Sequence, residues 1–290
     1  MTLVQLIPHI LNASIFLTVF TLGLDAVLTD TIVLLKRPGL ILRSVLAMNV
    51  IMPVIAIVIL TLLDPPRAIK IAVMTLSVSP VPPALPIRQM KAGGTQSYVI
   101  GLLFVAAVVS IGMVPLSVEV LGRYFRTYSH MPFDAVALIV LRTVIVPLVA
   151  GMLVRRFFPG LGTRIAKPSW LLAVALLAIG VLPVLIAAAP VVWAMIGQRI
   201  FISLIALAVS GFAVGHWLGG PEPEMRTILA FATSTRHPGV AIAIATINFP
   251  EEKTVLAVVF CHLVIGLVLA IPYSYWRRRK RMPAAVGAKP

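Results

Sequence analysis

Nine apolar segments, each long enough to cross a lipid bilayer, occupy most of this chain of 290 residues. A helix needs about 20 apolar residues to span the hydrocarbon core of a membrane. Backbone N–H and C=O groups cannot stay unpaired in lipid, so a single segment of this length crosses as a helix. The segments cover roughly residues 7–29, 39–63, 68–90, 96–121, 132–154, 168–194, 198–219, 226–248 and 254–276. The pattern predicts an all-α polytopic membrane protein with nine transmembrane helices.

The composition favours a membrane protein over a soluble one. Charged residues make up 11% of the chain and apolar residues 60%, whereas soluble domains contain about 25% charged residues. Only short loops separate the segments, among them the stretch from Arg155 to Pro168, so a single membrane domain, residues 1–290, is expected. Cys261 is the only cysteine, which excludes an intrachain disulfide and a metal site built on cysteines. No metal site, no cofactor and no cleavable signal peptide are predicted.

Positive charge is distributed unevenly between the loops. A net charge of +15 would suggest nucleic acid in a soluble protein, but here most of it lies in loops and in a basic tail, residues 277–290. If the C-terminus is cytoplasmic, 16 of the 24 Lys and Arg residues lie on the inner side and 6 on the outer side. This bias predicts an outer N-terminus and a cytoplasmic tail in a membrane of the bacterial inner (plasma) type. Membrane lipid, and no nucleic acid, is the expected partner of this charge.

Helix-breaking residues interrupt two of the nine segments near their middle. The interrupting residues are Ser79, Pro80, Pro83 and Pro86 in one segment, and Pro238 and Gly239 in the other. The two broken segments are the third members of two groups of four, which segment 132–154 separates. An odd offset of five spans makes the second group run opposite to the first, which is the inverted repeat of many secondary transporters. The pattern therefore predicts two crossover helices. Broken helices at corresponding places indicate that a binding site lies there.

Several short stretches, in order and spacing, are similar to one family of membrane proteins. They are Phe20–Leu24, Lys36–Pro38, Asn49–Pro53, Ser79–Gly94, Gly239–Ala243 and His262–Gly266. Over nearly its whole length the chain resembles the bile acid:sodium symporter (BASS) family. The resemblance implies a core domain, approximately 39–121 and 198–276, and a panel domain, approximately 7–29 and 132–194. It also implies a secondary transporter that works by alternating access, with the substrate bound between the two domains.

The chain departs from the sodium-coupled members of this family in the second crossover. Their motif carries a glutamate and a glutamine that bind sodium, and the matching positions here are Ala232 and Arg236. None of the nine Asp and Glu residues falls in either crossover, although sodium favours several oxygen ligands, ideally with an anionic one. The resemblance and its departures predict a carrier for a small organic anion that is not coupled to sodium. Proton coupling stays open.

Arg236 lies ten residues into its segment, close to the middle of the membrane. A central arginine costs at least about 2.5 kcal/mol on insertion scales, so it needs a partner or water. One interpretation is a fixed cation that attracts an anionic substrate. The other is a tethered substitute for sodium, in which the guanidinium binds unwound backbone carbonyls of the crossover. The sequence is compatible with both.

Further polar residues within the spans are candidates for the substrate site, each with a structural alternative. They are His237, Arg142, Asn49, Thr235 and His262. His237 could carry a proton, or stay neutral and hydrogen-bonded to the crossover. Arg142 could face the cavity from the panel side as a second anion contact. Asn49 and His262 could instead form hydrogen bonds between helices.

Other functions compete with a coupled carrier. An exchanger or uniporter of the same fold would need no cation, and a ligand sensor or channel would use the fold without a transport cycle. An enzyme is not expected, because no Ser/His/Asp arrangement, metalloprotease motif or paired membrane aspartate is present. A steroid acid, a 2-oxo acid and a pantoate-like acid all suit a cationic, partly apolar cavity. A monomer and a homo-oligomer are both compatible with the sequence.

Overall fold

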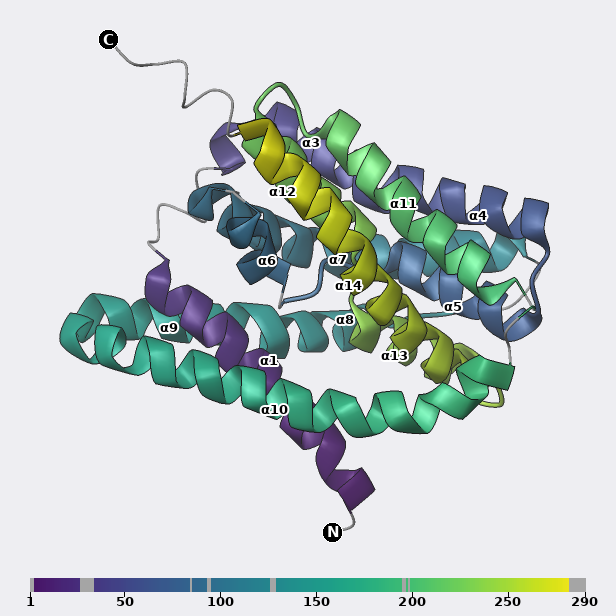
Figure 1. Ribbon diagram of the computed structural model, residues 1–290, viewed down its shortest axis with the longest axis horizontal. Coiled ribbons are helices and arrows are strands. Elements are labelled where there is room, and N and C mark those ends of the chain that lie inside the picture. The colour runs from purple at the N-terminus through teal and green to yellow at the C-terminus, as the bar shows by residue number, and fades with distance from the viewer. Residues whose placement is uncertain are drawn as a thin grey trace.

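The computed structural model describes residues 3–26, 34–83, 85–92, 95–125, 129–194, 197 and 199–281, and every regular element in these ranges is a helix. The α-helices, in chain order, are α1 (Leu3–Asp25), α3 (Pro38–Leu46), α4 (Met52–Leu63), α5 (Arg67–Val78), α6 (Leu85–Lys91), α7 (Gln96–Tyr124), α8 (Phe133–Val140), α9 (Val146–Phe157), α10 (Pro159–Ala194), α11 (Ile200–Leu218), α12 (Pro223–Ser234), α13 (Pro238–Asn248) and α14 (Thr254–Arg281). The shorter elements are a 3₁₀-helix, η1 (Leu34–Lys36), and two π-helical turns, η2 (Ala47–Ile51) and η3 (Leu141–Ile145). The predicted all-α class is confirmed (Figure 1).

Seven helical stretches among the described residues are long and apolar enough to cross a membrane. They are Leu6–Asp25, Pro38–Leu63, Gln96–Tyr124, Phe133–Phe157, Pro159–Ala194, Ile200–Leu218 and Thr254–Arg277. The other two predicted segments, 68–90 and 226–248, are each divided into two short helices, α5 with α6 and α12 with α13. The count of nine membrane crossings therefore stays a prediction, which depends on these two broken pairs.

One predicted loop is wrong. The stretch from Arg155 to Pro168 is largely helical, because α9 continues to Phe157 and α10 already begins at Pro159. Proline fits the first turn of a helix, where its missing N–H has no intrahelical partner to lose. Pro168 lies inside α10 and does not end it. The charges and prolines that suggested a loop are thus accommodated within two helices.

The last helix continues into the predicted basic tail. α14 ends at Arg281, and the side chain of Arg277 is buried, with 6% exposure. Its guanidinium donates hydrogen bonds to Thr227 Oγ1 (2.8 Å) and to the Pro223 carbonyl (2.6 Å). Arg277 therefore fastens the end of α14 to the first turn of α12.

Helices α1, α9 and α10 pack together on one side of the molecule (Figure 1). Gly23 and Gly151 let α1 and α9 approach closely, because a Cβ atom at Gly23 would collide with the carbonyl oxygen of Leu148. The same helices, with α8, make up the predicted panel domain. The division into panel and core stays a prediction.

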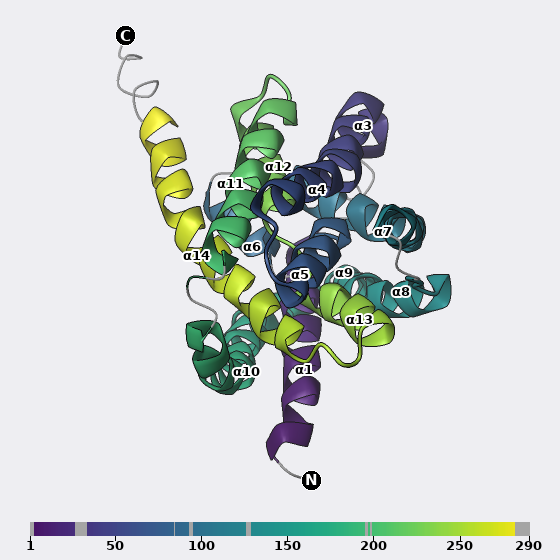
Figure 2. The same cartoon turned by 90° about the vertical axis from the view of Figure 1, so that its right-hand side faces the viewer.

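The most buried helices are the first halves of the two broken pairs. In α12 every residue from Thr227 to Ser234 is buried, and α5 buries nine of its 12 residues. Figure 2 shows α5 in the middle of the bundle, where it contacts α4, α13 and α14. In contrast, only 11% of the α10 span is buried. The breaks thus lie inside the protein, where irregular backbone at membrane depth is tolerated.

Contacts between loops agree with the predicted alternation of the spans. At the end that holds Arg37, called the Arg37 end, Arg37 Nη1 lies 2.8 Å from Glu222 Oε1. At the same end, Gln96 Nε2 donates a hydrogen bond to the Asp25 carbonyl (2.5 Å). These contacts join three loops that the charge bias places on the inner side.

The opposite end, called the Arg67 end, joins loops that the charge bias places on the outer side. Arg67 Nη2 lies 3.1 Å from Glu251 Oε1. Arg199 donates to the carbonyl of Leu63, the last residue of α4. Because the span Pro38–Leu63 connects the two ends, they lie on opposite faces of a membrane that this span crosses.

Candidate functional site

The two broken helices meet at their breaks. α5 ends at Val78 and α12 at Ser234, and the next residues, Ser79 and Thr235, have extended backbones. A proline disfavours helical geometry in the residue before it and lacks the N–H that would continue the helix, which explains the break at Pro80.

The breaks are joined by a backbone hydrogen bond. The His237 N–H donates to the Pro80 carbonyl at 2.8 Å. Of the predicted crossover residues, Ser79, Pro80 and Pro83 lie in the first break, Pro86 lies in the first turn of α6, and Pro238 and Gly239 begin α13. The sequence therefore located both breaks, and the structure brings them into contact at one crossing.

Arg236 lies inside this crossing and is almost completely buried, with 1% exposure. Its Nη1 donates hydrogen bonds to the carbonyls of Met48 and Ser79, both at 3.2 Å. Its Nε and Nη2 have no hydrogen-bond partner among the described residues. The guanidinium thus binds backbone carbonyls at the crossing, which is the geometry of a tethered cation.

The Met48 carbonyl is available because the helix is irregular there. Met48 lies in the π-turn η2, where the Met52 N–H bonds to the Ala47 carbonyl and not to that of Met48. The next N–H in line would be that of residue 53, which is a proline and has none. Because neither N–H group of its own helix bonds to it, the Met48 carbonyl can accept the hydrogen bond from Arg236.

His237 caps the second half of the broken pair. Its Nδ1 accepts from the N–H groups of Gly239 (3.1 Å) and Val240 (3.4 Å). An acceptor at Nδ1 places the ring proton on Nε2, so the bonded form is the neutral imidazole. This geometry favours the structural interpretation of His237 over a proton carrier. The first N–H groups of α13 are also used by the cap, which leaves them unavailable to an anion.

The remaining predicted site residues lie in different surroundings. Thr235 is half-buried beside the crossing, and Asn49 is half-buried in η2, where its Nδ2 donates to the Val45 carbonyl (3.3 Å). His262 on α14 is buried, with 1% exposure, and lies close to Ser234 and Arg236 at the crossing. Arg142 lies in η3 and is exposed, and it shares no hydrogen bond with the described residues of the crossing.

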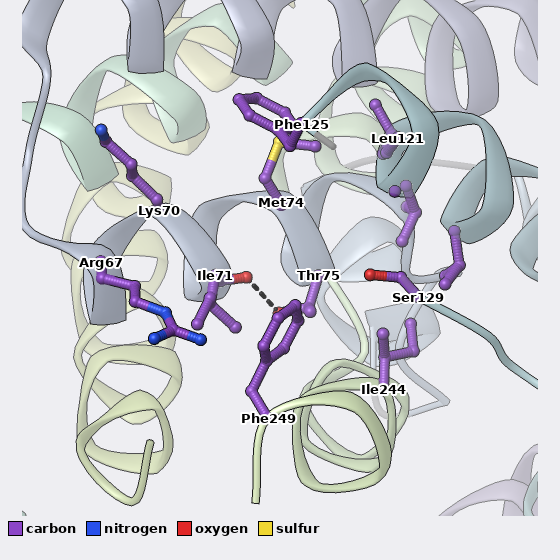
Figure 3. Close-up of a pocket in the computed structure, with 13 residues that line it drawn as sticks. Arg67, Lys70, Ile71, Met74, Thr75, Leu121, Phe125, Ser129, Ile244 and Phe249 are labelled. Carbon is purple, nitrogen blue, oxygen red and sulfur yellow. Dashed lines mark hydrogen bonds between the residues drawn. The ribbon is translucent and has the colours of Figure 1, made fainter. Parts of the chain in front are cut away.

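A cavity of about 290 Å³ opens at the Arg67 end, beside α5, the helix that ends at the first break. α5, α7 and α13 line it, together with Phe125, Ser129 and Phe249. Figure 3 shows Arg67 and Lys70 together on one side, with Leu121, Ser129 and Ile244 on the other. The candidate site residues predicted from the sequence do not line this cavity. Its signal was the helical spacing of Arg67, Lys70 and the apolar residues that follow them on α5.

The comparison with protein families agrees with the earlier resemblance. The profile of the Sodium Bile acid symporter family matches residues 13–210, which is more than half of the chain. The chain belongs to this family. It is a membrane protein of a transporter family, and its matched range includes the first break and ends within α11, before the second. No curated protein matches the chain in a sequence comparison.

Proposed function

We propose that this protein is a secondary carrier that moves a small organic anion by alternating access, without sodium. The observation that carries the proposal is the Arg236 guanidinium, bound to the Met48 and Ser79 carbonyls where the two breaks meet. Broken helices that meet in this way form the substrate and ion sites of many secondary transporters. Membership of the sodium bile acid symporter family supports the transport class.

The oxygen atoms at the crossing that could bind a cation support transport without sodium coupling. Alkali and alkaline-earth cations bind oxygen ligands, including backbone carbonyls. Two such carbonyls are already bound by Arg236, whose positive charge also repels a second cation. The described carboxylates lie in loops or close to helix ends, at Asp25, Asp64, Glu119, Asp134, Glu222, Glu224, Glu251 and Glu252. None of them is available to a cation at the crossing.

An anionic substrate follows from the charge of the same site. Arg236 is permanently protonated, and none of the ion pairs among the described residues includes it. A buried cation without a carboxylate makes the potential along the crossing positive, which favours an anion that approaches it. The half-buried side chains of Thr235 and Asn49 are the proposed polar contacts of the substrate in this region.

Transport in proteoliposomes tests the proposal. The full chain would be reconstituted, and uptake measured for a 2-oxo acid, an aliphatic hydroxy acid and the aromatic acid cinnamate, with protein-free vesicles as the control. At least one acid is expected to accumulate at the same rate in sodium and in potassium buffers of equal ionic strength. A sodium-dependent gain of about tenfold, which corresponds to ~1.4 kcal/mol, would contradict the assignment of Arg236 as the cation of the crossing. No uptake of any acid would contradict a carrier of small organic anions.

A further inference from the structure

The cavity at the Arg67 end has a cationic mouth and an apolar interior. Among the described residues that line it, only Arg67 and Lys70 are charged. From Arg67 the lining residues of α5 continue at helical spacing to Val78, about 16 Å along the helix at ~1.5 Å per residue. The cavity therefore extends from the charged end of α5 to the last residue before the first break.

Apart from Arg67 and Lys70, the polar side chains among the described lining residues are those of Thr75 and Ser129. Thr75 Oγ1 donates to the carbonyls of Ile71 (2.9 Å) and Ala72 (3.1 Å) in its own helix. The remaining lining residues around it are mainly apolar, namely Ile71, Met74, Val78, Val118, Leu121, Phe125, Ile244 and Phe249. A ligand that fills this space needs an apolar body, because a polar one would lose its hydrogen bonds to water without replacement.

The carboxylates near the mouth are partners of the cations but do not line the cavity. Arg67 pairs with Glu251 (3.1 Å) and Glu252 (3.4 Å), and Lys70 pairs with Asp64 (2.5 Å). The Arg67 and Glu251 side chains are 64% and 57% exposed. An exposed pair such as that of Arg67 with Glu251 contributes only about 0–1 kcal/mol, whereas the Glu252 side chain is only 22% exposed. A carboxylate that enters from the cavity can therefore replace Glu251 at Arg67 at little cost.

We propose that this cavity binds an organic monocarboxylate with an apolar body, whose carboxylate takes Arg67 from Glu251. The proposal rests on the proposed function and deepens it, since it assigns the substrate class and a binding site at one end of the molecule. The carboxylate binds Arg67 with two parallel hydrogen bonds, the arrangement that a guanidinium favours. The body packs against Met74, Val78 and Ile244.

When the ligand replaces Glu251 as the partner of Arg67, a contact between α5 and the loop that follows α13 is also lost. Arg67 is the first residue of α5, whereas Glu251 and Glu252 lie in the loop between α13 and α14. With the ligand bound, this loop loses the ion pair of Glu251 with Arg67. The site thus couples binding of the acid to loosening of the Arg67 end.

Binding to the purified full chain, measured by calorimetry in detergent, tests the proposal with two probes of the same shape. Cinnamate is the acid and cinnamyl alcohol its neutral counterpart. Arg67→Gln is expected to weaken cinnamate binding severalfold, up to about fivefold, because Arg67 is exposed, and to leave cinnamyl alcohol unchanged. The double variant Glu251→Gln with Glu252→Gln is expected to strengthen cinnamate binding, because the competing carboxylates are removed. Lys253→Gln, which removes a positive charge from the same loop outside the cavity, is the matched control and is expected to change neither probe.

Two results would overturn the proposal. One is an equal loss of cinnamate binding in Arg67→Gln and Lys253→Gln, which would indicate a general effect of charge. The other is equal affinity of the wild-type protein for the acid and the alcohol. If Arg67→Gln does not fold, the double variant Glu251→Gln with Glu252→Gln still tests the proposal, because unchanged cinnamate affinity in this variant contradicts the exchange.

Uptake measured on the same proteins separates this site from the carrier function. Uptake that does not depend on Arg67 overturns only the site, whereas Arg67-dependent binding without any uptake overturns only the carrier.

Discussion

Arg236 retains its charge in the protein interior through backbone carbonyls and not through a carboxylate. Burying a guanidinium is expensive unless its hydrogen bonds are replaced. Here Nη1 has two carbonyl acceptors, from Met48 and Ser79, that lie outside the regular helical hydrogen bonding. The arginine and the irregular backbone stabilise each other, because each supplies the partner that the other lacks.

Replacement of Arg236 should therefore lower stability. Arg236→Met keeps a long side chain but leaves the Met48 and Ser79 carbonyls unpaired, which costs about 1–3 kcal/mol for each buried group left without a partner. The free energy of unfolding, measured by denaturant titration in detergent, should fall by this order. Arg164→Met on the exposed surface of α10 is the control and should change it little. A variant at 236 as stable as the wild type would show that the two hydrogen bonds do not hold the crossing.

The sequence indicated Arg236 as a site candidate and backbone carbonyls of the crossover as possible partners, but it did not indicate Met48. An arginine in the middle of an apolar span is a clear signal, because such a residue is costly in lipid. Its acceptor at Met48, however, is 188 positions away in the chain. That acceptor is a carbonyl, which every residue carries, so no side-chain pattern could indicate it. Arg67 and Lys70, the two cations at the mouth of the cavity, were also not predicted as site residues. The sequence places Arg67 in a loop and Lys70 at the start of a predicted span.

Two spans contain the same irregular element. The π-turns η2 and η3 lie in similar sequences, Ala-Met-Asn-Val-Ile-Met-Pro at 47–53 and Leu-Arg-Thr-Val-Ile-Val-Pro at 141–147. In each, the residue before the proline bonds five positions back and not four. The missing proline N–H leaves one carbonyl free in either span. Only the carbonyl in η2 is bonded by Arg236.

A double-mutant cycle tests whether Pro53 creates the acceptor for Arg236. Pro53→Ala supplies an N–H that can bond the Met48 carbonyl within the helix, so Arg236 loses part of its contribution. The effects of Pro53→Ala and Arg236→Met on the free energy of unfolding should differ from additivity by about 1 kcal/mol. Pro147→Ala, at the corresponding position of η3, is the matched control and should be additive with Arg236→Met within about 0.5 kcal/mol. Equal coupling in both cycles would contradict a local role for Pro53.

Small residues allow α11 and α12 to pack closely. Gly211 and Gly215 on α11, and Gly219 directly after it, recur every four residues and face the α12 backbone. A Cβ atom at Gly215 would lie 2.5 Å from the Ala230 Cα atom. Helices in membranes commonly associate through such stripes of small residues. The spacing was visible in the sequence, but the helix that it contacts was not.

Gly215→Ala should therefore destabilise the protein. The added methyl group meets backbone atoms, which cannot rotate away, so a loss of about 1–3 kcal/mol is expected in the free energy of unfolding. Gly112→Ala in α7 is the matched control, because no atom lies within 4 Å of its Cβ position. That change should raise stability by about 0.5–1 kcal/mol, as alanine favours the helix. A stable Gly215→Ala variant would indicate that α11 and α12 are free to separate.

At the scale of the whole molecule, the length of the apolar segments predicted the seven long apolar helical stretches among the described residues. Predicted segment 39–63 coincides with the span Pro38–Leu63, and segment 198–219 with Ile200–Leu218. This length depends only on local composition, which a bilayer constrains strongly. The crossing and the cavity depend instead on how distant helices pack. Helix packing in lipid is set by close contacts and not by hydrophobicity, so the sequence alone did not define them.

The orientation in the membrane is the last prediction. The charge bias places the Arg67 end outside and the Arg37 end inside, and the loop contacts at each end agree with this grouping. In a Cys261→Ala background, single cysteines would replace the exposed residues Lys253 at the Arg67 end and Lys36 at the Arg37 end. A membrane-impermeant maleimide should label Lys253→Cys in intact cells, and Lys36→Cys only after permeabilisation. Labelling of both in intact cells would contradict the alternation of the spans. The reverse pattern would keep the fold and invert its orientation, which would mean that the charge bias does not determine the topology of this chain.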